Sequence, residues 1–265
     1  MWSMTELSER AATRSPFSVL GMLGMLYGAA CYLFFLVTFL YVIGFLADVP
    51  FLPKTVDRAE TVTPPLAAVL INGALLALFA VQHSVMARPA FKRAWTRIVP
   101  ASLERSTYVL AATLAVVLLL WQWRPITDVV WSVTTPAAVV ALYALQALGW
   151  AVLLLATFLI NHFELFGLRQ VLAAMRGRSV PEPEFRTPLL YKLVRHPLYL
   201  GFVIAFWAAP HMSVGHVLFA IGGTGYILVG IFFEERDLAA LFGQKYREYQ
   251  KRVPMLLPFG KSDGR

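Results

Sequence analysis

The sequence has few charged residues and a single cysteine. Of its 265 residues, 14% are charged and 58% are hydrophobic, whereas a soluble domain carries about 25% charged residues. The lone thiol of Cys31 cannot form an internal disulfide, and no paired Cys and His spacing indicates zinc, so no metal site is expected. The chain also lacks the G-x-G-x-x-G, P-loop, G-x-S-x-G and H-E-x-x-H motifs, which excludes the common soluble sites built on them.

Charge is missing from long blocks and concentrated between them, which is typical of membrane spans. We therefore predict an all-α polytopic membrane protein of five to six transmembrane helices, with a C-terminal helical hairpin and an amphipathic cytosolic tail. The last charge-free block, 198–233, is too long for one crossing and contains Pro210, which should interrupt a helix. Within a single membrane domain, 1–265, the predicted spans are about 19–46, 66–86, 104–123, 137–160 and 198–210 plus 213–233, and the tail is 234–265.

The distribution of basic residues predicts the orientation of these spans. With the N-terminus inside, the inside segments hold 20 of the 23 Lys and Arg residues, so both termini are expected in the cytoplasm. Arginine outnumbers lysine 17 to 6, which favours a GC-rich bacterial genome and hence a bacterial inner membrane. Basic loops beside anionic headgroups account for the net charge of +8, so membrane lipids are expected partners and nucleic acid is not. The oligomeric state is not indicated.

Polar residues gather at the inside-facing ends of the predicted spans. The clusters are Gln82-His83-Ser84 with Arg88, Glu104-Arg105-Ser106, Asn161 to Glu164, Arg195 to Gly201, and Glu234-Glu235-Arg236. Five clusters on one membrane face are more than a purely structural membrane protein needs. The convergence predicts a functional site at the cytoplasmic ends of the helices.

The cluster that begins at Arg195 suits an anion. Pro197 fits the first turn of a helix, where its missing N–H costs nothing. The free N–H groups that follow attract a carboxylate, and Arg195 and His196 add donors beside them. The alternative is that Arg195 and His196 only anchor a helix at the headgroups.

The acidic pair Glu234 and Glu235 stands on a face where basic residues predominate. Two carboxylates there indicate a cationic or hydroxylic ligand, or a simple tie to Arg195. Further along, Tyr246 and Tyr249 alternate with basic residues, which is typical of a segment lying on the membrane surface.

Two stretches of the C-terminal third carry a family resemblance. "RHPLYLG", an apolar segment and then "EERDLAALFGQKYREYQKRVPMLLP" resemble the C-terminal signature of the isoprenylcysteine carboxyl methyltransferase superfamily. The upstream stretches "QHSVMARPAFKRAW", "ERSTYVL" and "NHFELFGLRQ" resemble its nurim-like branch, which includes bacterial enzymes that methylate a small thiol.

The resemblance implies S-adenosyl-L-methionine as cofactor, held between the last spans and the tail. Its carboxylate would meet the helix start, a glutamate would meet its ammonium group or ribose hydroxyls, and tyrosines would pack on its adenine or sulfonium. The cofactor-binding residues implied are Arg195, His196, Pro197, Tyr199, Gly201, Glu234, Glu235, Tyr246 and Tyr249.

The implied reaction is methylation of a small volatile thiol, methanethiol, to dimethyl sulfide. A thiol reacts as its thiolate, so we expect His83 or His162 to act as the base, Arg105 to supply a positive field and Glu164 to orient a histidine. Either histidine could instead be a polar cap at the interface. Two further alternatives are methylation of an isoprenylcysteine or another lipid-soluble acceptor, and a non-catalytic nurim-like membrane protein.

Overall fold

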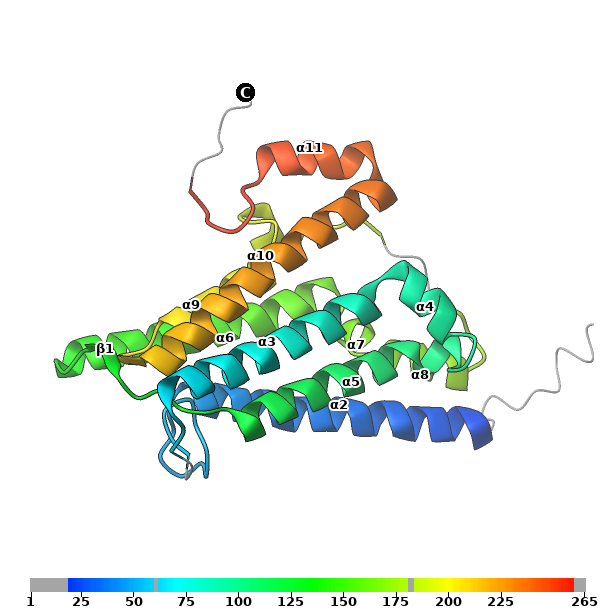
Figure 1. Ribbon diagram of the computed structural model, residues 1–265. Coiled ribbons are helices and arrows are strands. Elements are labelled where there is room, and N and C mark those ends of the chain that lie inside the picture. Colours follow the sequence, from blue (N-terminus) through cyan, green and yellow to red (C-terminus); the bar gives the residue numbers. More distant parts are fainter. Residues whose placement is uncertain (1–18, 60–61, 181–183, 260–265) are drawn as a thin grey trace, which may run out of the picture.

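The computed structural model describes residues 19–59, 62–180 and 184–259. Within these ranges, five helices are long and apolar enough to cross a membrane, which confirms the predicted all-α polytopic class (Figure 1). The elements are α2 (Val19–Leu46), α3 (Pro65–Ala87), α4 (Pro89–Trp95), α5 (Ala101–Gln122), β1 (Val129–Ser132), α6 (Pro136–Ile160), α7 (His162–Leu165), α8 (Leu168–Met175), the 3-10 helix η1 (Leu189–Lys192), α9 (Pro197–Trp207), β2 (His211–Ser213), α10 (Val214–Phe242) and α11 (Gln244–Arg252). The predicted cytoplasmic N-terminus and the last six residues of the predicted tail lie outside the described residues.

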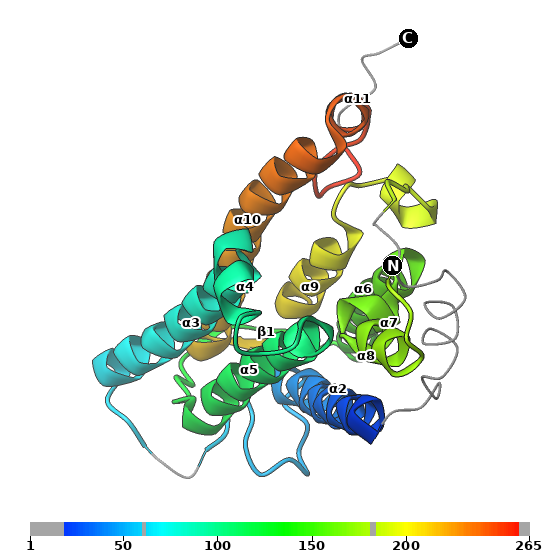
Figure 2. The ribbon, with the colours of Figure 1, turned by 90° about the vertical axis from the view of Figure 1, so that its right-hand side faces the viewer.

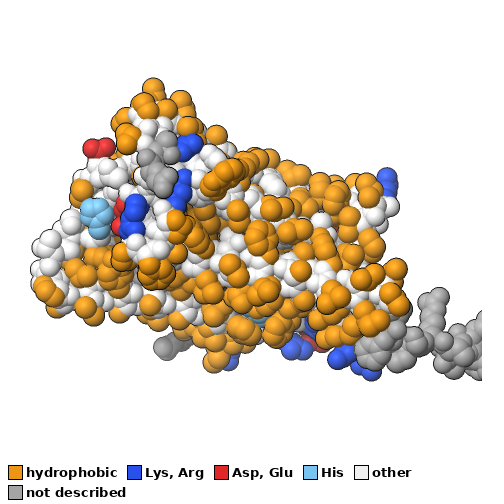
Figure 3. Space-filling model, turned by 90° about the horizontal axis from the view of Figure 1, so that it is seen from below, with side chains coloured by type: hydrophobic (Ala, Val, Ile, Leu, Met, Phe, Trp, Pro, Cys, Tyr) orange, Lys and Arg blue, Asp and Glu red, His pale blue; other side chains and the backbone are white. Residues whose placement is uncertain are grey.

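The outer surface suits a lipid environment. Seen from below, beside α2, the molecule is almost entirely hydrophobic, with charged side chains near the margins (Figure 3). Leu20, Leu26, Leu33 and Leu40 of α2 are all exposed. Exposed leucines along a whole helix are stable against lipid tails, which supports the membrane assignment.

Helix α9 lies between α10 and α6 and packs closely on α6 (Figure 2). A Cβ atom on Gly201 would lie 2.6 Å from the backbone oxygen of Gly149 and 2.6 Å from the backbone nitrogen of Leu153. Only glycine lets the two backbones approach this closely, as in small-residue contacts between membrane helices. This contact fixes the position of the α9 start relative to the end of α6.

The predicted boundary between the last span and the tail, at residue 233, does not coincide with the end of a helix. Helix α10 continues through Glu234 and Glu235 to Phe242 instead of ending at 233. The residues after 233 are good helix formers, and the helix stops only at Gly243, whose φ of +58° favours glycine. The two glutamates therefore project from a continuous helix, which fixes their directions.

A small antiparallel sheet closes the end of the bundle opposite α4 and α8 (Figure 1). Strand β1 pairs with β2 through Val129 and Ser213, and the sequence analysis did not predict either strand. At the same end, the buried Asn72 side chain bonds to both the backbone N–H and the carbonyl of Arg124, at 2.8 and 2.7 Å. These contacts hold the loops between the helices.

Candidate functional site

The predicted helix start at Pro197 is present and faces a cavity. Pro197 occupies the first turn of α9, and the His196 side chain does not cap the helix. The backbone N–H groups of the first turn of a helix have no partner within that helix. The α9 start therefore offers donors and the positive end of a helix dipole to a negatively charged group.

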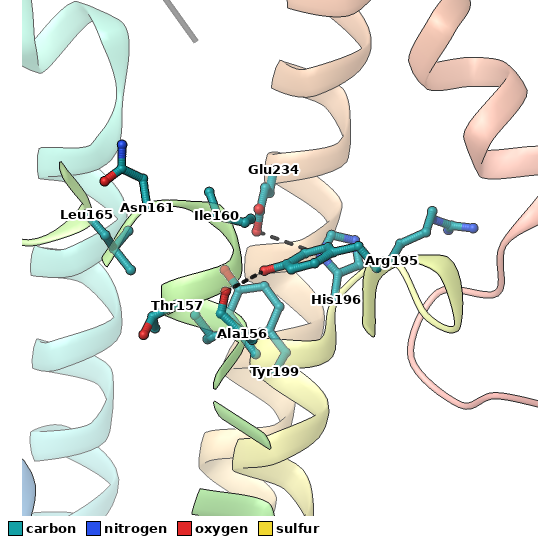
Figure 4. A pocket seen from close by; sticks show the side chains of 11 residues that line it. Ala156, Thr157, Ile160, Asn161, Leu165, Arg195, His196, Tyr199 and Glu234 are labelled. Carbon is teal, nitrogen blue, oxygen red and sulfur yellow. Dashed lines mark hydrogen bonds and ion pairs between the residues drawn. The ribbon is translucent and has the colours of Figure 1, made fainter. Parts of the chain in front are cut away.

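A cavity of about 150 Å³ lies between the end of α6, η1, the start of α9 and α10 (Figure 4). Its lining residues are Ala156, Thr157, Ile160, Asn161, Leu165, Tyr191, Arg195, His196, Leu198, Tyr199 and Glu234. Four predicted cofactor residues, from α9 and α10, thus come together in one place. The volume is below the roughly 300 Å³ of pockets that enclose a drug-sized ligand, so the cavity fits only part of a nucleoside cofactor.

The predicted alternative of an Arg–Glu tie is what the structure has for Glu235. Its Oε1 accepts from Arg195 Nε at 2.6 Å and lies 3.0 Å from His196 Nε2, and its Oε2 accepts from Gln250. Arg195 Nη1 also donates to the carbonyls of Gln250 and Val253. This network ties the α9 start and α10 to the C-terminal segment. Both carboxylate oxygens of Glu235 have partners within it.

Glu234 is in a different position. Its side chain is 43% exposed and lines the cavity, with Oε2 3.9 Å from His196 Nδ1. Figure 4 shows it above the His196 and Tyr199 rings. Of the two adjacent carboxylates, Glu234 is the one open to a ligand.

The two tail tyrosines pack away from the cavity. Tyr246 and Tyr249 are buried against the ring of Phe185, and the Tyr249 hydroxyl donates to the carbonyl of Tyr191. Burial raises the pKa of Tyr246, and it raises the pKa of Tyr249 to about 12, so both remain neutral phenols. Neither lines the cavity; Tyr249 fastens α11 to η1, and Tyr246 packs on Phe185, which precedes η1.

Gly201 and Pro197, two further predicted cofactor residues, have structural positions. Gly201 forms the close contact with α6 described above, and Pro197 is fully buried at the first turn of α9. Neither lines the cavity. They shape the site by placing the α9 backbone.

His162 is buried beside the cavity with both ring nitrogens engaged. Its Nε2 lies 2.8 Å from the Tyr32 hydroxyl, its Nδ1 lies 2.8 Å from the Thr157 hydroxyl, and its ring stacks on Phe158. Burial lowers the pKa of His162, so the ring is neutral. Glu164 accepts from Asn161 and Arg169, and none of its described contacts orients a histidine.

His83 and Arg105 lie on α3 and α5, outside the lining of the cavity. The His83 ring is surrounded by the rings of Phe79, Tyr108 and Tyr226, with centroids 5.2, 5.0 and 6.1 Å away. Arg105 lies over the Tyr108 ring at 5.6 Å. The predicted catalytic residues therefore fall into two groups, one at His162 and one at His83.

Three polar lining residues, Asn161, Thr157 and Tyr191, were not among the predicted site residues. Asn161 belongs to a polar cluster that was recognised, so its position beside His162 was the available signal. Thr157 lies one turn earlier in an apolar span, and Tyr191 follows a loop, so no sequence pattern distinguished either.

The profile of a family described as NnrU protein matches residues 69–255. The chain belongs to the NnrU family. All the predicted site residues of this NnrU chain fall inside the matched segment. No solved structure matches the chain significantly.

Named relatives of this NnrU chain cover most of its length. A Mycobacterium tuberculosis protein named methanethiol S-methyltransferase is 60% identical over 238 residues, 89% of this chain and 96% of the relative. Methanethiol S-methyltransferase 1 of Bradyrhizobium diazoefficiens is 55% identical over 91% of this chain and 84% of its own length. Nurim of Rattus norvegicus is 31% identical over 66% of this chain and 70% of its own. The predicted relation to the nurim-like branch is confirmed.

Proposed function

We propose that this protein is an integral membrane methyltransferase that transfers a methyl group from S-adenosyl-L-methionine to methanethiol and releases dimethyl sulfide. The observation that carries the proposal is the 60% identity to a relative named methanethiol S-methyltransferase, over 96% of that relative. This identity favours this acceptor over an isoprenylcysteine and over a non-catalytic role.

The donor set of the cavity fits the amino-acid end of the cofactor. The α9 start with His196 suits its carboxylate, Glu234 suits its ammonium group, and the Tyr199 ring suits its sulfonium. When bound, the cofactor supplies an electrophilic methyl group. Nε and Nη1 of Arg195 are engaged by Glu235 and the C-terminal segment. We therefore assign Arg195 to holding that segment beside the cavity rather than to direct contact with the cofactor.

The cavity holds only part of the cofactor, so its nucleoside end must extend toward the C-terminal segment. Backbone bonds from Arg195 N–H to the Pro254 carbonyl and from His196 N–H to the Met255 carbonyl place this segment beside the α9 start. We assign Tyr246 and Tyr249 to holding α11 in this position. The protein thereby orients the reactants and excludes water, which are the main contributions an enzyme makes to methyl transfer.

The proposed orientation places the site at the cytoplasmic side of a bacterial inner membrane, with both termini inside. Twenty of the 23 Lys and Arg residues belong to the segments that this orientation puts inside. S-adenosyl-L-methionine is a charged cytosolic compound and reaches this side without crossing lipid. Methanethiol is small and apolar and reaches the site from either phase.

The test is a headspace assay on membranes from a heterologous host that contain the protein. With methanethiol and methyl-deuterated S-adenosyl-L-methionine, we expect dimethyl sulfide that carries the labelled methyl group. Glu234→Gln should weaken equilibrium binding of S-adenosyl-L-homocysteine by about tenfold, the effect of losing roughly one charge-assisted hydrogen bond. Glu184→Gln, in an exposed pair with Arg186, is the matched control.

A parallel vial with a farnesylcysteine analogue separates the alternatives. Methylation of that analogue without dimethyl sulfide would replace the proposed acceptor. If neither product forms and S-adenosyl-L-homocysteine does not bind, the protein is not a methyltransferase of this kind.

A further inference from the structure

His83 differs from every other described histidine near the site in having a buried ring nitrogen without a partner. The Nδ1 atom of His83 is buried and makes no hydrogen bond with any described residue, whereas both ring nitrogens of His162 are engaged. A buried polar atom without a hydrogen bond costs about 1–3 kcal/mol. A ring nitrogen with this cost, among apolar rings, indicates a missing hydrogen-bond partner.

The surroundings of His83 suit a small apolar donor. Phe79, Tyr108 and Tyr226 come from three helices, α3, α5 and α10, and face its ring. Sulfur beside aromatic rings gains about 0.3–1.5 kcal/mol per contact. Three rings around one nitrogen therefore suit a compact apolar thiol better than a polar ligand.

Tyr199 connects this aromatic site with the cavity. Tyr199 lines the cavity and is near enough to Glu234, Tyr226 and Tyr108 to interact electrostatically with all three. Its hydroxyl also lies beside α10, 3.9 Å from where a Cβ atom on Gly230 would be. Tyr199 therefore connects the cavity with the neighbourhood of the aromatic site.

We propose that the acceptor thiol binds in the aromatic site and that Nδ1 of His83 removes its proton. This proposal rests on the proposed function and deepens it. The thiol proton passes to Nδ1, the freed electron pair on the thiol sulfur forms the new S–C bond, and the pair of the broken C–S bond stays on the donor sulfur. His83 then returns the proton to water. Arg105, beside Tyr108, favours the thiolate over the thiol.

The first experiment compares His83→Gln with His162→Gln and with His211→Gln, a matched change at the exposed β2 end of the molecule. We expect His83→Gln to lower kcat/KM for methanethiol by roughly 10²-fold or more, the usual contribution of a positioned base. His211→Gln should keep the wild-type value. Binding of S-adenosyl-L-homocysteine to His83→Gln, measured by calorimetry on purified protein, should be unchanged because His83 does not line the cavity.

A more acidic acceptor separates a base from a residue that only shapes the site. With 2,2,2-trifluoroethanethiol, which ionises more readily than methanethiol, the loss caused by His83→Gln should shrink by at least about tenfold because the base is needed less. An equal loss with both thiols, or a loss in His162→Gln with full activity in His83→Gln, overturns the proposal. If the wild-type protein itself forms no dimethyl sulfide, the result refutes the proposed function instead.

A second variant tests the location without changing His83, in case His83→Gln does not fold. Phe79→Ala widens the aromatic site, so the kcat/KM ratio of 1-propanethiol to methanethiol should rise by about 10-fold or more, the effect of one or two methylenes in an apolar pocket. An unchanged ratio places the acceptor elsewhere and overturns the proposal.

Discussion

Replacing Arg195 by methionine should release the C-terminal segment from the bundle. Arg195 and Glu235 form a pair at 2.6 Å whose side chains are only 8% and 17% exposed. Removing one partner of a buried pair costs about 3–5 kcal/mol. Glu235 keeps His196 and Gln250 as partners, so we expect the lower end of this range, about 3 kcal/mol.

That free energy corresponds to roughly a 10²-fold increase in the population in which α11 is detached. Hydrogen exchange of protein in lipid nanodiscs measures this population directly, because local opening controls the exchange of the backbone amides in 244–252. We expect exchange in this segment to accelerate by that factor in Arg195→Met, while α2 keeps its wild-type rates.

Two further variants check the reasoning. Replacing both partners, Arg195→Met with Glu235→Met, should cost less than Arg195→Met alone because no buried charge is left unpaired. Arg186→Met breaks a pair that is 75% and 70% exposed and should have little effect, since exposed pairs contribute at most about 1 kcal/mol. Wild-type exchange of α11 in Arg195→Met would show that the tail is held by other contacts.

Three more perturbations have defined outcomes. Gly201→Val should destabilise the α6–α9 contact by about 1–3 kcal/mol, seen as a lower thermal midpoint in detergent. Asn72→Leu should lower the free energy of unfolding by about 1–3 kcal/mol because two backbone groups of Arg124 lose their partners. The folded variant should bind S-adenosyl-L-homocysteine as tightly as the wild type. Burial lowers the pKa of His162 below its ordinary value of 6.5. As the pH drops through about 6.5, His162 therefore becomes protonated in the unfolded chain before it does in the folded protein, and the free energy of unfolding should fall. A pH series of thermal midpoints should show this fall in the wild type and a flatter dependence in His162→Gln.

The long helices could be predicted from the sequence because apolar blocks of about 20 residues without charge are typical of membrane spans. The end of α10 could not, because Glu234 looks like the start of a polar tail while the local propensity for helix continues to Gly243. The strand pair was missed for a related reason. Three or four residues in two distant loops pair only after the helices bring the loops together.

The candidate site could be predicted in its location and only partly in its roles. The motif around Arg195 correctly indicated a helix start beside a carboxylate pair. Which carboxylate is free depends on a rotation of about 100° per residue along a helix, and only coordinates place Glu234 on the cavity and Glu235 on Arg195. Gly201 belongs to the same motif, yet its role is helix packing.

The cavity and the proposed aromatic site suit the opposed needs of the proposed reaction. The cavity at the α9 start is polar and bordered by Glu234, as a charged cofactor requires, whereas the site at His83 is walled by aromatic rings, as a volatile thiol requires. A single open pocket would expose the thiolate to water, which stabilises it and slows its attack. Tyr199 lines the cavity and lies near Tyr226 and Tyr108, so in the proposed arrangement each reactant keeps its own surroundings until the sulfur and the methyl group meet. Enlarging Tyr199 to tryptophan would therefore be expected to slow the transfer and, because Tyr199 lines the cavity, to weaken cofactor binding as well.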